Sequence, residues 1–384
     1  MADIELGIIV NGATGRIAST QHLTNALVPI RDQGGLMVGD KRVVLKLLLL
    51  GRNAEKLSGI AKTHGIADFT TDFDAALARP DMHIFFDAAA THARVATLEK
   101  AIVAGKHIYT EKPVAPSVAA GQQLLNAIKK RGLKAGAVED KIFLPGLQKL
   151  AMLVRSGFFG TVTGFRLEFG WWVFDGIERA ANRPSWNYKK TGGGGMTSDM
   201  YPHWRYVIET LLGPIAAVTH SARTALAERA DEQGVGFAPD VDDSATTLVE
   251  LASGATGVIV STWAARIRRD DILTLQIDGT GGSALAGIHK CWMQPAPATP
   301  TVRHMNPMTD IGADYRSDWQ EVPAASPVVN GYRACWERFL AHVVADTALP
   351  NNLAAGIRDV ALAEACARSM AERRWISFDD TPAR

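Results

Sequence analysis

The first 142 residues alternate short apolar runs with amphipathic segments, and this alternation constrains the fold more than any other feature. Strands that alternate with helices form parallel βαβ units, so residues 1–142 are expected to form a doubly wound, Rossmann-type domain. A glycine-containing segment, 32–41, is expected to be a loop. The predicted strands are 6–10, 43–50, 84–90 and 107–110, and the predicted helices are 17–30, 54–64, 94–103 and 118–131.

The pattern changes in the second part of the chain, residues 143–384. Apolar runs follow one another there without intervening helices, which is typical of an antiparallel sheet. Two helical segments close the chain and are expected to pack back on the first domain. The proline-rich segment 295–307 is expected to be an irregular loop. The strand-like runs are 161–173, 243–251, 256–265 and 271–279, and the final helices are 331–344 and 354–373.

Composition excludes several classes of protein. The 384 residues carry a formal charge of +1 and are 47% hydrophobic, so the chain is neither disordered nor basic enough to favour nucleic acid. The most apolar run, Val43–Leu50, is too short for a membrane span, and the N-terminus has no signal-peptide pattern. Three widely spaced cysteines fit no disulfide framework or metal site. We therefore expect a cytoplasmic protein without bound metal, whose cysteines are Cys291, Cys335 and Cys366.

A glycine turn lies between the first predicted strand and the first predicted helix. Glycines in this position let the backbone approach a pyrophosphate, which the helix N-terminus then stabilises. The full dinucleotide fingerprint would also have glycine at Val10, and such turns also occur for structural reasons alone. The place of this turn at the first β/α junction favours the nucleotide-binding interpretation. The expected contacts are Gly12, Ala13, Thr14, Gly15, Arg16 and Ile17.

The residue that follows the second predicted strand bears on the choice between NAD and NADP. An acid at this position binds the ribose hydroxyls and repels a 2′-phosphate. The chain has Gly51, Arg52 and Asn53 instead. Arg52 could pair with the phosphate, which favours NADP and leaves NAD possible; alternatively, it is a solvated arginine in a turn.

Three segments resemble the Gfo/Idh/MocA family of oxidoreductases. They are AGKHIYTEKPVA at 104–115, GGGGMTSDMYPHWRY at 192–206 and LQIDGTGGS at 275–283. The resemblance implies a Rossmann domain followed by an α/β domain whose large, mostly antiparallel open sheet binds substrate and mediates dimer or tetramer contacts. It also implies hydride transfer between a nicotinamide and a carbohydrate-like substrate, such as a sugar or polyol.

The same resemblance assigns catalytic roles to Lys112, Asp199 and His203. Lys112 is expected to orient the substrate hydroxyl, and His203 to exchange its proton near neutral pH. If a helix begins near Asp199, this residue and His203 lie on one face about 5–6 Å apart, and Pro202 falls in the first turn. The alternatives are an N-cap role for Asp199, an exposed turn for Lys112 and an interface role for His203.

Further cofactor contacts are expected around the fourth strand and the EKP segment. The family has a TP-like turn followed by histidine, whereas this chain has AAATHAR, with Arg94 near the expected histidine. The resemblance also suggests a cis peptide before Pro113. The expected contacts are Ala89, Thr91, His92, Glu111 and Lys112.

The aromatic segment 170–188 is a candidate for the substrate pocket, because aromatic faces pack against the C–H faces of pyranoses. Its polar candidates are Asp175 and Arg183, with Trp186 as the aromatic one. The alternative is a core or subunit interface. Two other functions remain open: transient oxidation that drives elimination or epimerisation, and a non-catalytic nucleotide-binding regulator, which would not need the catalytic residues.

Overall fold

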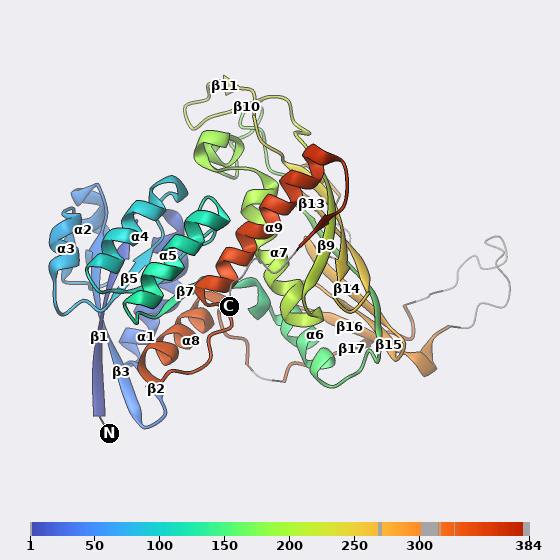
Figure 1. Cartoon of the computed structure of the whole chain (residues 1–384), viewed down its shortest axis with the longest axis horizontal. Helices are drawn as coiled ribbons and strands as arrows, with labels where there is room; N and C mark the ends of the chain where they lie inside the picture. The colour runs from blue at the N-terminus through green and yellow to red at the C-terminus, as the bar shows by residue number, and fades with distance from the viewer. Residues whose placement is uncertain (1, 268–270, 301–313, 315, 326, 379–384) are drawn as a thin grey trace.

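The computed structural model describes residues 2–267, 271–300, 314, 316–325 and 327–378. These residues form two large sheets with helices packed on and between them, and a separate two-stranded hairpin (Figure 1). Residues 301–307 of the predicted proline-rich loop lie outside the described part. Among the described helices, none is both long and apolar enough to cross a membrane.

The first sheet has the Rossmann strand order β4-β3-β1-β5-β6-β7, and all of these neighbours are parallel. The predicted doubly wound fold is therefore confirmed. The prediction of a loop at 32–41 is wrong in part, because β2 pairs antiparallel with the start of β3 around Gly39. The strands are β1 (Ala2–Asn11), β2 (Leu36–Val38), β3 (Lys41–Leu50), β4 (Asp68–Thr70), β5 (Ile84–Asp87), β6 (His107–Thr110) and β7 (Ala135–Ala137).

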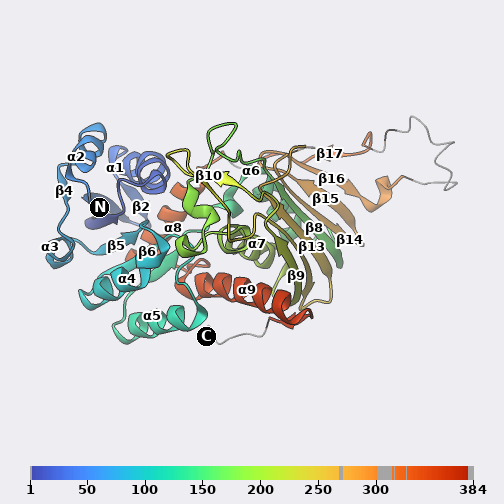
Figure 2. The ribbon, with the colours of Figure 1, turned by 90° about the horizontal axis from the view of Figure 1, so that it is seen from above.

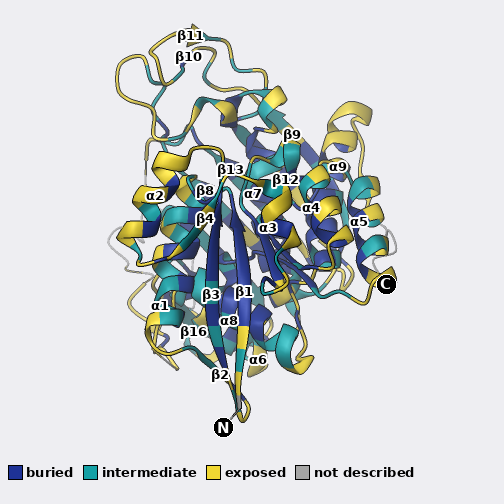
Figure 3. Ribbon diagram, turned by 90° about the vertical axis from the view of Figure 1, so that its left-hand side faces the viewer, coloured by how far each residue is buried: buried dark blue, intermediate teal, exposed yellow. Residues whose placement is uncertain are grey.

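Helices cover both faces of this sheet. Side chains of Asn53, Asp72 and Ser117 cap the N-termini of α2, α3 and α5, which is why these helices begin where they do. The C-terminal halves of β1 and β3 are buried between the layers (Figure 3). The helices are η1 (Ile17–Leu27, with wide π-type turns), α1 (Val28–Asp32), α2 (Ala54–Thr63), α3 (Phe73–Ala78), η2 (Thr91–Ala93), α4 (Arg94–Val103) and α5 (Val118–Lys130).

The second sheet has nine strands in the order β17-β16-β15-β14-β8-β13-β12-β9-β18. Only the β8–β13 pair is parallel within the described residues, so the predicted antiparallel character is confirmed. The strands are β8 (Val162–Gly170), β9 (Ile215–Arg223), β12 (Ser244–Leu251), β13 (Thr256–Thr262), β14 (Leu273–Gly279), β15 (Gly282–Ala286), β16 (Cys291–Pro295), β17 (Gln320–Glu321) and β18 (Ile376–Ser377).

Helices cover one face of this sheet, while a small hairpin and several 3-10 turns form the connections near it. Along β12, Ala245, Thr247 and Val249 are buried beneath the helices, and Leu248 on the opposite face is exposed. The helices and minor elements are η3 (Lys141–Phe143), α6 (Pro145–Arg155), η4 (Ser185–Tyr188), η5 (Lys190–Gly192), α7 (Met196–Leu212), β10 (Arg229–Ala230), β11 (Gly236–Phe237) and η6 (Ala296–Ala298).

The two C-terminal helices join the two halves of the molecule. Helix α8 (Gly331–Ala345) inserts Trp336 and Phe339 into the core on one face of the Rossmann sheet. Helix α9 (Leu353–Glu372) contributes Ile357 to the core on the other face and Cys366 to the core of the second sheet. Figure 2 shows α7 and α9 lying between the two sheets. All three cysteines are buried as free thiols.

Candidate active site

Helix α7 carries two of the predicted catalytic residues, and its start differs from the prediction. The helix begins at Met196, not near Asp199, because the carboxylate of Asp242 caps it from a distant loop. Asp242 Oδ2 accepts hydrogen bonds from the Thr197 amide (2.9 Å) and hydroxyl (2.6 Å). Gly195 has φ 115°, and a Cβ there would lie 2.6 Å from Asp242 Oδ1. Asp199 is therefore not the N-cap.

The earlier start of α7 also moves Pro202 from the predicted first turn into the helix interior. Proline has no amide hydrogen, so the carbonyl of Ser198 lacks its intrahelical donor at this point. Asp199 and His203 still lie four residues apart in one helix, as predicted, although each contacts a different set of partners.

Asp199 lies between two cations that come from different parts of the chain. Its Oδ1 accepts a 2.7 Å hydrogen bond from Lys112 Nζ, which also donates to the Asp199 carbonyl at 2.6 Å. Its Oδ2 accepts from Arg183, whose guanidinium stacks 4.5 Å from the Trp263 ring centroid. Burial alone would raise the pKa of Asp199, but Lys112 and Arg183 outweigh it and hold this pKa well below its usual range. Asp199 therefore remains an anion that orients the Lys112 ammonium.

Lys112 is the second residue of the turn that follows β6. The Lys112–Pro113 peptide bond is cis, as the family resemblance suggested. The Lys112 side chain is 13% exposed and that of Asp199 is 14% exposed, so a substrate oxygen can still reach this pair. The arrangement supplies a fixed ammonium donor that can stabilise negative charge on a substrate oxygen.

His203 is buried, with 5% of its surface exposed. Its Nδ1 is 3.3 Å from Glu139 Oε2, and within the described residues its Nε2 has no protein partner. Burial, together with Lys112 and Lys141, lowers the pKa of His203 well below its usual value. The expected titration near neutral pH is therefore wrong, and the imidazole is neutral there, which is the form that can accept a proton.

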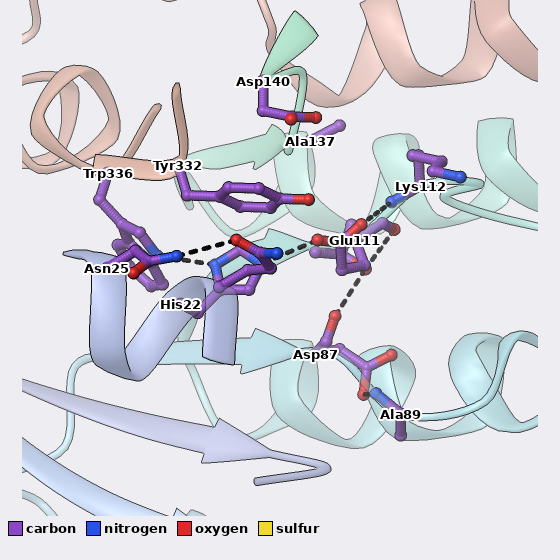
Figure 4. Close-up of polar contacts among 12 residues, drawn as sticks. His22, Asn25, Asp87, Ala89, Glu111, Lys112, Ala137, Asp140, Tyr332 and Trp336 are labelled. Atoms are coloured by element: carbon purple, nitrogen blue, oxygen red, sulfur yellow. Dashed lines mark hydrogen bonds and ion pairs between the residues drawn. The ribbon is translucent and has the colours of Figure 1, made fainter. Parts of the chain in front are cut away.

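Glu111 is held by a buried chain of hydrogen bonds that begins in α8 (Figure 4). Trp336 Nε1 donates to His22 Nδ1 at 2.9 Å, so the ring hydrogen of His22 lies on Nε2 and donates to Glu111 Oε1 at 2.8 Å. Burial would raise the pKa of Glu111, but His22 and Lys112 outweigh it and lower this pKa. Oε2 accepts from the amide of Lys112 at 3.2 Å, which links Glu111 to the neighbouring catalytic candidate.

The glycine turn lies where the Rossmann strand order reverses, between the ends of β1 and β5. Gly12 has φ 77°, and a Cβ there would lie 2.8 Å from the Ala89 nitrogen, so this position requires glycine for packing as well as for the turn. Arg16 and Ile17 lead into η1 immediately after the turn. A glycine turn that borders the crevice and is followed by a helix N-terminus can bind the pyrophosphate of a dinucleotide.

The other predicted cofactor residues border the same turn. Arg52 is exposed at the end of β3 and makes no ion pair among the described residues, whereas the neighbouring Asn53 caps α2. Ala89 is half-buried after β5, and Thr91 and His92 form η2.

Arg94, which lies near the position where the family has histidine, is 2% exposed. Its Nε donates to Asp87 Oδ2 at 2.9 Å and its Nη2 to the Ala89 carbonyl at 2.8 Å. Its Nη1 donates to the carbonyl of Pro113. The guanidinium therefore ties the turn after β5 to the turn that carries Lys112.

Two family models match the chain. Residues 7–138 match the oxidoreductase family with an NAD-binding Rossmann fold, and residues 147–285 match the GFO/IDH/MocA C-terminal domain. A D-xylose dehydrogenase from Paenarthrobacter nicotinovorans is 42% identical over 378 residues, with 97% of each chain covered. The chain belongs to the Gfo/Idh/MocA family.

Two levoglucosan dehydrogenases are also similar to this chain. A levoglucosan dehydrogenase from Pseudarthrobacter phenanthrenivorans is 26% identical over 297 residues, covering 74% of this chain and 73% of its own. A solved structure of a levoglucosan dehydrogenase in complex with NADH and levoglucosan aligns with a TM-score of 0.79 and 20% identity, covering 98% of this chain and 100% of that chain. The structural match extends across both sheets of this Gfo/Idh/MocA protein.

The three candidates in the aromatic segment take different positions. Arg183 contacts Asp199, whereas Asp175 uses its Oδ1 to accept from the amides of Ile177 and Glu178 in a local turn. Trp186 is 47% exposed. The structure brings only Arg183 of these three into contact with a predicted catalytic residue.

Several residues of the site were not identified from the sequence. Glu139 contacts His203, Trp263 stacks on Arg183, and Tyr188 is buried beside Trp263 with ring centroids 5.6 Å apart. The hydroxyl of Tyr188 has no hydrogen-bonding partner among the described residues. The sequence signal for Glu139 was weak: an acidic residue two positions after the end of β7, at the edge of the sheet where ligands bind to parallel strands. No group of His, Cys, Asp and Glu that could hold a metal occurs in the part of the chain that is described.

Proposed function

We propose that this protein is a nicotinamide-dependent sugar dehydrogenase whose substrate is an aldose of the D-xylose type. The observation that carries the proposal is the contact of Lys112 with Asp199 beside a neutral, buried His203. The 42% identity with a D-xylose dehydrogenase supports the substrate class. A regulator that only bound nucleotide would not need this buried contact.

Four residues carry the proposed chemistry. Lys112 donates a hydrogen bond to the reacting oxygen of the sugar, and Asp199 and Arg183 fix the position of that ammonium. His203 Nε2 accepts the hydroxyl proton as the C–H bond breaks. A bound nicotinamide supplies the hydride acceptor; Gly12, with its neighbours in the turn, would hold the pyrophosphate.

The direct test is a substrate panel. Purified protein is incubated with NAD⁺ or NADP⁺ and with D-xylose, other aldoses, inositols and levoglucosan, and the absorbance of the reduced nicotinamide is followed. We expect steady turnover with D-xylose or a close aldose. Tight cofactor binding with sugar conversion but no net reduction would instead favour elimination or epimerisation, and no conversion of any sugar would refute the proposal.

For the cofactor we propose a preference for NADP over NAD. Arg52 supports it, because this exposed cation has no ion-pair partner within the described residues and follows the strand that faces the adenosine ribose in Rossmann folds. Fluorescence titration with NADPH and NADH tests the preference. Equal affinities would refute it.

We also propose that the protein is a cytoplasmic homo-oligomer, a homodimer or homotetramer. The helix-free face of the nine-stranded sheet supports self-association, because apolar side chains are exposed on it: Leu248 is 48% and Trp375 44% exposed. These residues border a shallow groove together with Arg166 and Gln276. Light scattering on the purified protein and on Leu248→Asp tests the proposal; a monomeric parent would refute it.

A further inference from the structure

Two buried carboxyl groups lie behind His203 and have no role in the proposed function so far. Glu139 is 1% exposed, and Asp359 of α9 is fully buried. Asp359 Oδ1 accepts a hydrogen bond from Arg205 Nε, and Glu139 Oε2 faces His203 Nδ1 at 3.3 Å. The remaining oxygens, Glu139 Oε1 and Asp359 Oδ2, are both buried without a hydrogen-bond donor among the described residues.

Two unpaired carboxylate oxygens in a buried site are costly unless a proton lies between them. Burial and the negative charge of Asp359 raise the pKa of Glu139 well above its usual value, and the two side chains interact directly. Burial also raises the pKa of Asp359, although Arg205 opposes this shift. One proton on Glu139 Oε1, donated to Asp359 Oδ2, satisfies both oxygens.

We propose that Glu139 and Asp359 share one proton and form a relay that receives the substrate proton from His203. The proposal rests on the proposed function, because it concerns the proton that sugar oxidation releases. It assigns Glu139 and Asp359 as positioning and proton-relay residues that do not themselves contact the sugar.

The shared proton also fixes the ring of His203. A protonated Glu139 uses its Oε1–H toward Asp359, so its Oε2 is an acceptor for the Nδ1–H of His203. This tautomer leaves the lone pair on Nε2, the nitrogen without a protein partner among the described residues. Nε2 is then ready to accept a proton.

The relay consists of three linked proton transfers, over which atoms and charge balance. The substrate O–H bond breaks and an Nε2–H bond forms on His203, while the C–H electron pair leaves as hydride to the oxidised nicotinamide. The Nδ1–H bond of His203 breaks and an O–H bond forms on Glu139 Oε2. The Oε1–H bond of Glu139 breaks and an O–H bond forms on Asp359 Oδ2. His203 ends neutral, and the pair holds one additional proton.

Several charged and titratable groups interact with the members of this relay. Arg205 of α7 bonds both to Asp359 and to Glu209, so its charge remains compensated when Asp359 becomes neutral. Asp140 and Lys141 form an ion pair at 2.6 Å beside Glu139. The other groups that interact with members of the relay are Lys112, Asp199, Tyr206 and Cys335.

The first experiment needs no turnover. The infrared spectrum of the parent in heavy water at neutral pH is expected to contain the C=O stretching band of a protonated carboxyl, which Glu139→Gln removes. Histidine ¹⁵N NMR is expected to find His203 as the Nδ1–H tautomer in both proteins, since the Gln carbonyl still accepts from Nδ1. Absence of the band, or its survival in Glu139→Gln, would overturn the shared proton.

The second experiment measures one turnover of hydride transfer to NADP⁺ or NAD⁺ from the sugar identified by the panel, with D-xylose as the first probe. Glu139→Gln preserves the shape and the hydrogen bonds but cannot pass a proton on. We expect its single-turnover rate to fall at least about tenfold, with sugar KM and cofactor affinity nearly unchanged. The dependence of the rate on the heavy-water fraction is expected to be curved in the parent and linear in the variant.

Asp359→Asn removes the final acceptor and is expected to show the same loss. Glu337→Gln is the matched control, because Glu337 bonds to Arg333 within α8 and to neither carboxyl of the pair. A parent-like rate and curved dependence in Glu139→Gln would show that the pair is only structural. If the parent oxidises no sugar, the proposed function fails, whereas the infrared band still decides whether the proton is shared.

Discussion

Replacing Asp199 with asparagine tests the central contact of the site. The change keeps the shape of the side chain but removes the charge between Lys112 and Arg183. One amide oxygen can still accept from Lys112, while the amide NH₂ then faces the donors of Arg183. Because Asp242 caps α7, the start of the helix is not expected to change.

The magnitudes follow from these contacts. Loss of a charge-assisted hydrogen bond costs about 1.5–3 kcal/mol, so the melting temperature is expected to fall by a few degrees at neutral pH. The pKa of Asp199 is lowered on folding, so its ion pairs stabilise the protein above the unfolded pKa of about 3.9. The stability gap between parent and variant is therefore expected to close only below about pH 4.

The activity is expected to fall much more than the stability. Without the carboxylate charge, the hydrogen bond from Lys112 to the side chain of residue 199 is no longer charge-assisted, and the cations Lys112 and Arg183 lose the anion that lies between them. A misplaced ammonium is expected to lower kcat by about 10²-fold, which corresponds to about 2.7 kcal/mol. Steady-state kinetics with the sugar from the panel, together with thermal unfolding, measures both effects.

Asp175→Asn is the matched control, because Asp175 accepts backbone hydrogen bonds in a turn and does not contact Lys112. It is expected to retain parent-like kcat. Full activity of Asp199→Asn would refute the assigned role, and a large loss in Asp175→Asn alone would move the site to the aromatic segment.

Four further substitutions test other parts of the site. Lys112→Ala and His203→Ala are each expected to lower kcat by at least about 10²-fold with little change in NADPH affinity, measured by steady-state kinetics and fluorescence titration. A parent-like kcat in either variant would exclude that residue from the chemistry. Arg52→Ala is expected to weaken NADPH by about tenfold, or about 1.4 kcal/mol, and to leave NADH unchanged; parallel losses for both cofactors would contradict phosphate recognition. His22→Phe leaves Glu111 without its 2.8 Å donor, so cofactor affinity is expected to fall while kcat at saturation changes little. Unchanged affinity for both cofactors would show that this hydrogen bond does not position the cofactor site.

The fold could be predicted because it depends on periodic patterns. The strand β3 is an apolar run that lies beside β1 in a sheet covered on both faces, and β12 alternates between buried and exposed residues. The short strand β2 could not be predicted, because three residues between glycines carry no period and their pairing depends on the neighbouring β3. The start of α7 was missed for a similar reason, since its cap, Asp242, is distant in sequence.

The same distinction between local sequence patterns and contacts between distant residues applies to the candidate site. Lys112, Asp199 and His203 stand in recognisable motifs, so the sequence indicated them, and the helix spacing correctly placed two of them one turn apart. The pKa of His203 could not be predicted, since it depends on burial and on Lys141 from another element. Glu139 and Asp359 lie far apart in sequence and belong to no motif, and the packing of α9 against the end of β7 brings them together.

The successive turns of α7 contact different groups of the site. Asp199 faces Lys112, the proposed donor to the substrate oxygen, and His203, one turn later, faces Glu139. Arg205 then bonds to Asp359, the last acceptor in the proposed relay. Because Asp242 takes over the capping of the helix, the carboxylate of Asp199 remains available for Lys112. In the proposed mechanism, one helix therefore orients the reacting hydroxyl near its N-terminal end and leads the proton away toward the interior between the two sheets.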